Sequence, residues 1–341
     1  MGGRALETYT RRCNREEFDN ISVELTNTLK SDFKSVGIPL FYNNKVSFGD
    51  IDIVISTDGF NKDMATYITE TFNPTETYHN GNCWSFDYKE IQTDLITTSE
   101  EHFDSLLSYM SHNDKGNLMG RLAHHKGLKY GGLGLWYEHY FKNINLGKII
   151  LCKDQRRIYK FLDLDYDRNQ NGFDELVDIF EFISKSKYFD WRIFQLEKLN
   201  KVNRERNLKR TSYMSFLEWI DINKRDDRDI NEELFKDFEL SNVIESFPEA
   251  NLEMEIRRLE YEYCKTLYIK SKFNGGEVMR RYGFKGKELG SIISGFRLHI
   301  EHIASLYFNS FEDYIIDTDV NVIYGVFDDY LTRNNIKNYE N

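Results

Sequence analysis

The spacing of hydrophobic residues divides the chain into a mixed first part and a helical remainder. In residues 14–36, apolar side chains recur every three or four positions, which predicts an amphipathic helix. Residues 50–55 alternate between acidic and aliphatic side chains, as is typical of a strand with one buried face. Strands are also predicted over 83–88, 91–97 and 147–152, and helices over 61–72, 100–111, 173–185, 190–207, 212–223, 231–247, 252–268, 276–282, 289–307 and 322–333.

This order of elements predicts an α+β fold, in which a mixed sheet with helices is followed by an all-helical C-terminal half. No fixed-period repeat and no low-complexity linker separates the two parts. A chain of 341 residues is long enough for two domains. We therefore expect one domain over residues 1–165 and a second over residues 166–341.

Composition excludes several classes of protein. Aromatic residues make up 15% of the chain, too many for a disordered protein, and four widely spaced cysteines cannot support a disulfide scaffold. The apolar runs are far shorter than the roughly 20 residues of a membrane helix, and the N-terminus lacks the apolar stretch of a secretory signal. We therefore expect a cytoplasmic protein without a membrane partner. The net charge of -11 repels polyanions at long range, which argues mildly against a nucleic acid.

Three aspartates carry the sharpest chemical signal. Asp50 and Asp52 lie two positions apart, so on a strand their side chains share one face while Ile51 and Ile53 take the other. Asp94 lies within a second apolar segment, where a carboxylate without a partner is costly. If the two strands are adjacent, the three carboxylates converge on a site for Mg²⁺ or Mn²⁺ and two-metal phosphoryl transfer. The alternative is a plain polar strand face with a capped or salt-bridged Asp94, because acid pairs are frequent among 56 acidic residues.

The segment Ser47–Ile55 together with Asp94 resembles the palm of the DNA polymerase β-type nucleotidyltransferases, which include poly(A) polymerases and CCA-adding enzymes. Residues 272–279 and 283–290 are similar to the G-x-x-G-K-x-x-G helical segment of CCA-adding enzymes. The chain also looks like nucleotidyltransferases predicted in large phages and viruses, which would place it in a host cytoplasm. The resemblance implies a palm fold, with Asp50, Asp52 and Asp94 as catalytic metal ligands. It also implies transfer from an NTP to a hydroxyl, most often an RNA 3′ end, with release of pyrophosphate.

One departure from the family concerns the triphosphate. The family usually carries a Gly-Ser pair shortly before its first aspartate, and this pair grips the triphosphate. The chain has Phe41-Tyr42-Asn43-Asn44-Lys45 there, so we expect the nucleotide to contact Tyr42, Asn43, Asn44 and Lys45, with Gly49 allowing close approach. The absence of the Gly-Ser pair also leaves open a non-standard nucleotide donor or an inactive member of the family.

A second nucleotide contact is expected where a helix begins after Asn113 and Asp114. Its N-terminus would face the nucleotide, with Asn117 there and Arg121 near the phosphates. The alternative is ordinary helix capping.

Two basic clusters lie in the helical part. Residues 201–210 hold five basic residues against one acidic residue, and residues 265–287 hold seven against one, with aromatic residues interleaved. Cations that follow phosphates and rings that stack on bases are typical of a groove for RNA, with a tRNA-like acceptor as one candidate. The candidate residues are Arg204, Arg206, Lys209, Arg210, Lys272, Arg280, Arg281, Lys285 and Lys287. The alternative is solvated helix faces with the rings in the core.

The sequence therefore predicts, first, a template-independent nucleotidyltransferase with an NTP donor and an RNA acceptor bound by the helical domain. A second hypothesis is a degenerate palm that serves only to bind RNA or protein. A third keeps the chemistry but transfers the nucleotide to a protein or a small molecule. Oligomeric state is left open by all three.

Overall fold

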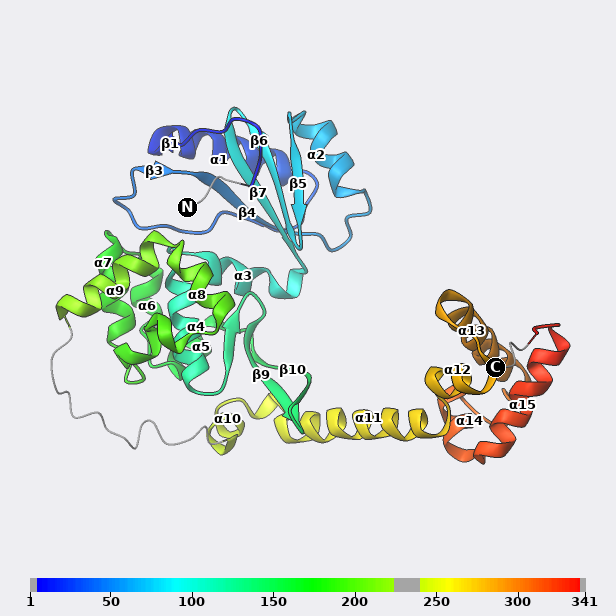
Figure 1. Ribbon diagram of the computed structural model, residues 1–341. Coiled ribbons are helices and arrows are strands. Elements are labelled where there is room, and N and C mark those ends of the chain that lie inside the picture. Colours follow the sequence, from blue (N-terminus) through cyan, green and yellow to red (C-terminus); the bar gives the residue numbers. More distant parts are fainter. Residues whose placement is uncertain (1–4, 224–239, 338–341) are drawn as a thin grey trace. The chain divides into compact units, whose positions relative to one another are not determined.

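The computed structural model describes residues 5–223 and 240–337 (Figure 1). They form two compact units, the first being Met1–His139 with Gly147–Leu252 and the second Tyr140–Leu146 with Glu253–Asn341. The division thus follows Leu252, and the boundary expected after residue 165 does not coincide with it. The physical reason is that helix α7 (Leu176–Ser184) packs against α4 (Lys115–His125), so helices that follow residue 165 belong to the first unit.

A five-stranded sheet carries the first part of the chain, in the order β2 (Val36–Gly37), β4 (Asp50–Ser56), β7 (Ile91–Thr98), β6 (Cys83–Tyr88) and β5 (Thr77–Asn80). Strands β4 and β7 are parallel, and the other neighbours are antiparallel. The mixed sheet and its strands over 50–55, 83–88 and 91–97 are confirmed.

One face of this sheet is covered by α1 (Arg15–Leu29) and α2 (Met64–Phe72) (Figure 1). Ile51, Ile53 and Ile55 of β4 are fully buried in the core beneath these helices. The start of α1 is fixed by a reciprocal capping box between Asn14 and Glu17. The opposite face of β4 carries Asp50 and Asp52 together with Val54, which is fully buried.

Two smaller sheets complete the strands. β1 (Cys13–Asn14) pairs with β3 (Ser47–Phe48), and β8 (Lys129–Gly131), β9 (Gly134–Phe141) and β10 (Ile144–Cys152) form a three-stranded sheet. The glycine-rich segment after Lys129 is the turn between β8 and β9. Gly134 is required there, because its φ is +95° and an added Cβ would lie 2.3 Å from the carbonyl oxygen of Cys152.

The remaining elements of the first unit are helical. They are η1 (Glu100–His102), α3 (Phe103–Met110), α5 (Gln155–Phe161), α6 (Tyr166–Gln170), η2 (Trp191–Phe194), η3 (Leu196–Lys198), α8 (Lys201–Leu208), α9 (Thr211–Asn223), α10 (Leu240–Ser246) and η5 (Pro248–Ala250). The single helix predicted over 190–207 is wrong in its first half. Asp190 and Asn200 each accept a backbone N–H bond, which starts a separate turn at each of these residues. Residues 231–239 of another predicted helix lie outside the described residues.

The second unit is built on α11 (Leu252–Lys272), α12 (Gly275–Tyr282), α13 (Gly286–Ile303), α14 (Phe311–Asp317) and α15 (Val320–Arg333). Its core gathers aromatic side chains such as Phe273, Phe296 and Phe327. The helical C-terminal half is therefore confirmed at this coarse level. None of the helices in the described part of the chain combines the length and apolar character needed to cross a bilayer.

Candidate metal centre and the cavity it faces

Asp50, Asp52 and Asp94 meet on the face of the five-stranded sheet opposite to α1 and α2. The parallel register of β4 and β7 places Asp52 directly beside Asp94, and Asp50 lies two residues from Asp52 on the same face. One carboxylate oxygen from each residue lies within 4.8 Å of the others. The expectation that the two strands are adjacent and bring the three acids together is confirmed.

The cluster is electrostatically unfavourable without a cation. Burial raises the pKa of Asp52 well above its usual value, and the charges of Asp50 and Asp94 raise it further. Burial also raises the pKa of Asp94, which hydrogen bonds from Ser85 and Gln92 partly oppose. Three hard oxygen donors at this spacing fit a divalent cation, since ligands on opposite sides of one Mg²⁺ are about 4.2 Å apart. The residues can therefore hold a metal ion.

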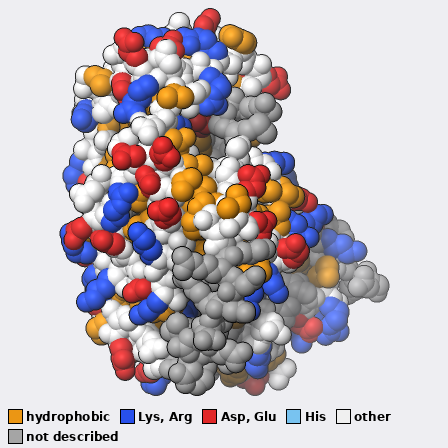
Figure 2. Space-filling model, turned by 90° about the vertical axis from the view of Figure 1, so that its left-hand side faces the viewer, with side chains coloured by type: hydrophobic (Ala, Val, Ile, Leu, Met, Phe, Trp, Pro, Cys, Tyr) orange, Lys and Arg blue, Asp and Glu red, His pale blue; other side chains and the backbone are white. Residues whose placement is uncertain are grey.

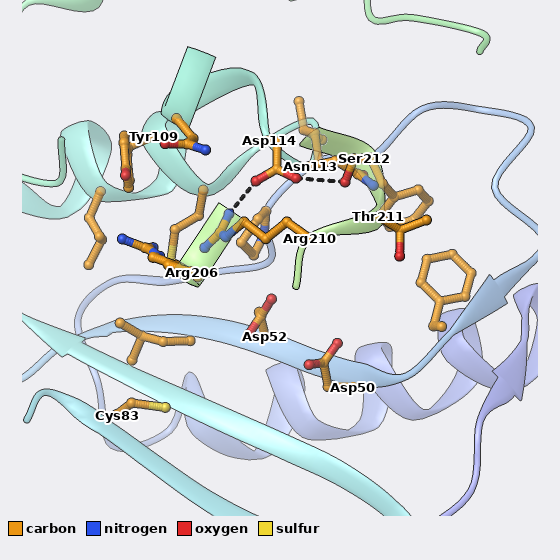
Figure 3. Close-up of a pocket in the computed structure, with 18 of the residues that line it drawn as sticks. Asp50, Asp52, Cys83, Tyr109, Asn113, Asp114, Arg206, Arg210, Thr211 and Ser212 are labelled. Atoms are coloured by element: carbon orange, nitrogen blue, oxygen red, sulfur yellow. Dashed lines mark hydrogen bonds and ion pairs between the residues drawn. The ribbon is translucent and has the colours of Figure 1, made fainter. Parts of the chain in front are cut away.

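A cavity of about 1340 Å³ opens over Asp50 and Asp52 (Figure 3). Asp94 lies beside Asp52 but is not among the residues that line the cavity. Asp50 and Asp52 point from β4 toward the side of the cavity that carries Arg206 and Arg210. A third side is apolar and is lined by Ile38, Pro39, Leu40, Phe41, Leu106, Tyr109 and Met110. The cavity thus has an acidic, a basic and an apolar side within the first unit.

The basic side is formed by one face of α8 and the turn after it. Val202, Glu205, Arg206 and Lys209 all line the cavity, and their spacing of three and four residues places them on one helix face. Asn207 fixes the helix to α4 by accepting a hydrogen bond of 3.1 Å from the side-chain amide of Asn117.

Asp114 holds the turn between α8 and α9 against the cavity. Its carboxylate, only 6% exposed, forms an ion pair with Arg210 and accepts a hydrogen bond of 2.6 Å from Ser212 (Figure 3). The predicted helix start after Asp114 is confirmed as α4, but Asp114 makes no side-chain capping bond. Its role depends on residues far along the chain, so local sequence could not reveal it.

The loop expected to contact the triphosphate is only partly directed at the cavity. Lys45 lines the cavity, and its Nζ lies 4.7 Å from the centre of the Phe48 ring. Burial lowers the pKa of Lys45, and the charges of Asp50 and Asp52 oppose this shift. Asn43 donates to Asp174 and to the carbonyl of Phe173, and the backbone of Asn44 donates to the carbonyl of Asp174. Neither of these asparagines lines the cavity, nor do Tyr42 and Gly49.

The other expected nucleotide contacts are also divided. Asn117 lines the cavity from the first turn of α4. Arg121 does not line it, because its guanidinium donates two hydrogen bonds, of 3.1 and 2.7 Å, to the carbonyl of Ile193. Asn117 therefore reaches the cavity, whereas Arg121 links α4 to η2.

The candidate RNA-binding residues differ in their surroundings. Arg206, Lys209 and Arg210 line the cavity, whereas Arg204 donates to the carbonyls of Leu196 and Leu199. In the second unit, Lys272 donates to the carbonyls of Ile316 and Thr318 at the end of α14.

The remaining candidate residues of the second unit lie on α12 and at the start of α13. Arg280 and Arg281 both bond Glu277, which lowers the pKa of Glu277 to about 2. Lys285 and Lys287 are exposed at the start of α13. The rings of Phe273, Tyr282 and Phe284 are buried in the core, as the alternative interpretation of this cluster predicts. The other two interleaved rings are not, since Tyr263 is half-buried and Tyr268 is exposed.

On the face of the molecule drawn in Figure 2, basic and acidic side chains are interspersed. On that face the Lys and Arg residues do not join into one continuous patch. Any anion-binding region there is therefore local.

A scan against protein-family models finds no match, and a search of curated proteins finds none either. The geometry of the site is therefore the basis on which a function is inferred.

Proposed function

We propose that the protein is a metal-dependent, template-independent nucleotidyltransferase that transfers a nucleotide from an NTP to an RNA 3′ hydroxyl and releases pyrophosphate. One observation carries this proposal: Asp50 and Asp52, two of the three clustered carboxylates, face the basic side of α8 across a single cavity. A nucleoside triphosphate needs both features, since its phosphates bind a divalent cation on one side and Arg or Lys on another.

The sides of the cavity match the parts of a nucleotide. Asp50 and Asp52 would hold Mg²⁺ or Mn²⁺, and Arg206 and Lys209 would contact the triphosphate. The half-buried ring of Tyr109, on the apolar side, would contact the base. In this proposal the basic face of α8 binds the triphosphate, which the Gly-Ser pair binds in the family that the sequence resembles.

The chemistry follows from the carboxylates. The bound cation would neutralise phosphate charge and favour ionisation of the acceptor hydroxyl. The hydroxyl oxygen bonds to the α-phosphorus, the bond from that phosphorus to pyrophosphate breaks, and a carboxylate oxygen of Asp94 accepts the hydroxyl proton. Asp94 is proposed for this role because it lies directly beside Asp52 in the carboxylate cluster.

The strand arrangement also supports a nucleotidyltransferase palm. The carboxylates lie on adjacent parallel strands of a mixed sheet whose other face is packed by two helices. In the second unit, the exposed Lys285 and Lys287 and the half-exposed ring of Tyr268 are suited to phosphates and bases of an RNA acceptor. A tRNA-like acceptor stays a prediction.

The test is incubation with each labelled NTP in turn, Mg²⁺ or Mn²⁺, and a pool of total RNA. A labelled RNA band would identify the base and the acceptor class together. Asp50→Ala and Asp52→Ala should abolish labelling while the circular dichroism spectrum stays unchanged. Full labelling by either variant would contradict the proposal.

A second candidate function is a binding module that has lost catalysis. It is favoured by one observation, which concerns the loop at the position of the family's Gly-Ser pair. Asn43 and Asn44 of this loop are hydrogen-bonded to Phe173 and Asp174, so these groups are not available to bind phosphate. Equilibrium dialysis with labelled ATP separates the two. A degenerate module would bind RNA but show no Mg²⁺-dependent ATP binding, whereas the enzyme would show it.

A further inference from the structure

We propose that Gln92 is a positioning residue for the metal ligand Asp94, and that the N-terminal segment Ala5–Thr8 fixes Gln92 in this role. The inference rests on the proposed function, because it concerns the same metal centre. It adds a regulatory connection: the order of a terminal segment would set how well the site binds its cation.

The side-chain amide of Gln92 lies between the segment and the carboxylate. Its Nε2 donates to both oxygens of Asp94, at 2.9 and 3.2 Å. Its Oε1 accepts a hydrogen bond of 2.8 Å from the backbone N–H of Ala5. Gln92 is only 2% exposed, and it pairs in register with Asp50 on the face of the sheet that holds the metal centre. Both ends of its amide are therefore bonded within the protein.

The segment itself is anchored at several further points. The backbone N–H groups of Glu7 and Thr8 donate to the carboxylate of Glu76, at 2.9 and 2.7 Å. Glu76 in turn donates its own N–H to Asp87 of β6. Further on, the N–H of Arg11 donates to the carbonyl of Glu90. The segment therefore crosses from the start of β5 to the turn before β7, and Ala5 reaches β7 itself.

The chain of hydrogen bonds has a direct consequence for the cation. A carboxylate held by an outer hydrogen bond presents a fixed oxygen to the metal, and loss of such an outer partner typically weakens metal binding about 10- to 100-fold. Because the Ala5 N–H polarises the amide, it makes the Gln92 NH₂ a stronger donor. Release of the segment would therefore loosen Asp94 without changing any ligand.

The test measures Mn²⁺ binding by isothermal titration calorimetry on the full chain, independently of any activity. Gln92→Leu removes the two hydrogen bonds to Asp94 and the one from Ala5 and keeps a side chain of similar volume, so we expect its Mn²⁺ affinity to fall about 10- to 100-fold. Asp50→Asn serves as the reference, because it removes the negative charge of one ligand. Thermal unfolding of each variant shows whether the fold is retained.

Ala5→Pro provides a second variant outside the core, since Ala5 is exposed and the change deletes the N–H that donates to Gln92. We expect a smaller fall in Mn²⁺ affinity, and no further fall when Ala5→Pro is added to Gln92→Leu. Leu6→Pro is the matched control, because it restricts the same segment but keeps the Ala5 N–H, and its affinity should match that of the wild type.

The outcomes distinguish a failure of this inference from a failure of the proposed function. If Asp50→Asn weakens Mn²⁺ binding but Gln92→Leu and Ala5→Pro do not, the role of Gln92 is wrong and the metal centre stands. If the wild type shows no Mn²⁺ binding that depends on Asp50, both the proposed function and this inference fail. Additive effects of Ala5→Pro and Gln92→Leu would overturn the part played by the segment.

Discussion

Two basic segments that look alike in the sequence, residues 201–210 and residues 265–287, have different surroundings in the structure. In the first, Arg206, Lys209 and Arg210 line a cavity that also holds carboxylates. In the second, Arg280 and Arg281 are bonded to Glu277, and Lys272 caps the end of α14. A count of charges therefore predicts that cations are present but not what they bind.

The difference teaches that a basic residue is informative about a ligand only after its partners within the protein are known. Arg206 and Lys209 lie across the cavity from Asp50 and Asp52. An anionic ligand that carries a bound metal ion therefore fits between the basic and the acidic side chains. In the second unit, Lys285 and Lys287 are exposed and suited to a surface anion such as the RNA backbone. The proposed roles are thus donor binding for the first segment and acceptor binding for the second.

The largest expected effect comes from removing the cavity-facing cations. Arg206→Ala with Lys209→Ala should raise KM for the NTP by roughly 100-fold or more, because each hydrogen bond to a charged group contributes about 1.5–3 kcal/mol. Steady-state kinetics at varied NTP concentration would measure it. Lys285→Ala with Lys287→Ala removes the same number of charges and should leave this KM unchanged. Equal KM changes in both double variants would refute the division of roles.

A cation buried inside the first unit extends the comparison to a third environment. Lys115 is fully buried, and its Nζ donates to the hydroxyl of Tyr159 and the side-chain carbonyl of Asn169, each at 2.6 Å. Burial lowers the pKa of Lys115 from 10.5 to about 7. Between pH 7 and pH 10.5, Lys115 keeps its proton in the unfolded chain but loses it in the folded protein. The free energy of unfolding should therefore rise with pH across this range.

From pH 7 to pH 9 this rise should be about 2–3 kcal/mol. Urea unfolding at the two pH values would measure it, and Lys115→Met should lack this contribution. A wild-type protein whose stability changes with pH no more than that of Lys115→Met would show that Lys115 titrates normally.

A smaller effect is expected from breaking the ion pair of Asp114. Arg210→Met leaves a buried carboxylate with only Ser212, and should lower the free energy of unfolding by about 2 kcal/mol, since Arg210 is partly exposed. Adding Asp114→Asn should restore most of the loss. In the second unit, Glu277→Gln breaks exposed pairs and should change thermal unfolding little. Equal destabilisation by both changes would contradict the contrast between the two units.

The smallest expected effect is on salt dependence. Lys285→Ala with Lys287→Ala should lower the slope of log affinity for single-stranded RNA against log salt by roughly 1.4, at about 0.7 per phosphate contact. Filter binding across a salt series would measure the slope. An unchanged slope would remove these two lysines from the acceptor site.

The carboxylate cluster could be predicted from the sequence because it depends on local rules. Alternation along β4 fixes the shared face of Asp50 and Asp52 and the burial of Ile51 and Ile53. One tertiary assumption, that the strand of Asp94 is adjacent, was enough to complete the cluster. Long periodic helices such as α11 and α13 were predicted for the same reason.

The rest depends on contacts between distant residues. The sequence predicts Arg121 near phosphate, since nothing in its neighbourhood reveals its bond to the carbonyl of Ile193. The pairing of Asp114 with Arg210 and the position of Gln92 beneath Ala5 likewise join residues that sequence patterns do not connect. Short helices such as α5 and α14 offer too few turns for a hydrophobic period to stand out.

The parallel pairing of β4 with β7 has a consequence for how the protein acquires its site. These strands are separated in the chain by α2 and the β5–β6 hairpin, so their pairing is non-local and carries the entropy cost of closing a long loop. Asp52 and Asp94 come together only when that loop closes. A partly folded chain that has formed α1 and the hairpin therefore has no complete ligand set, and cation binding would report on completion of the sheet during folding.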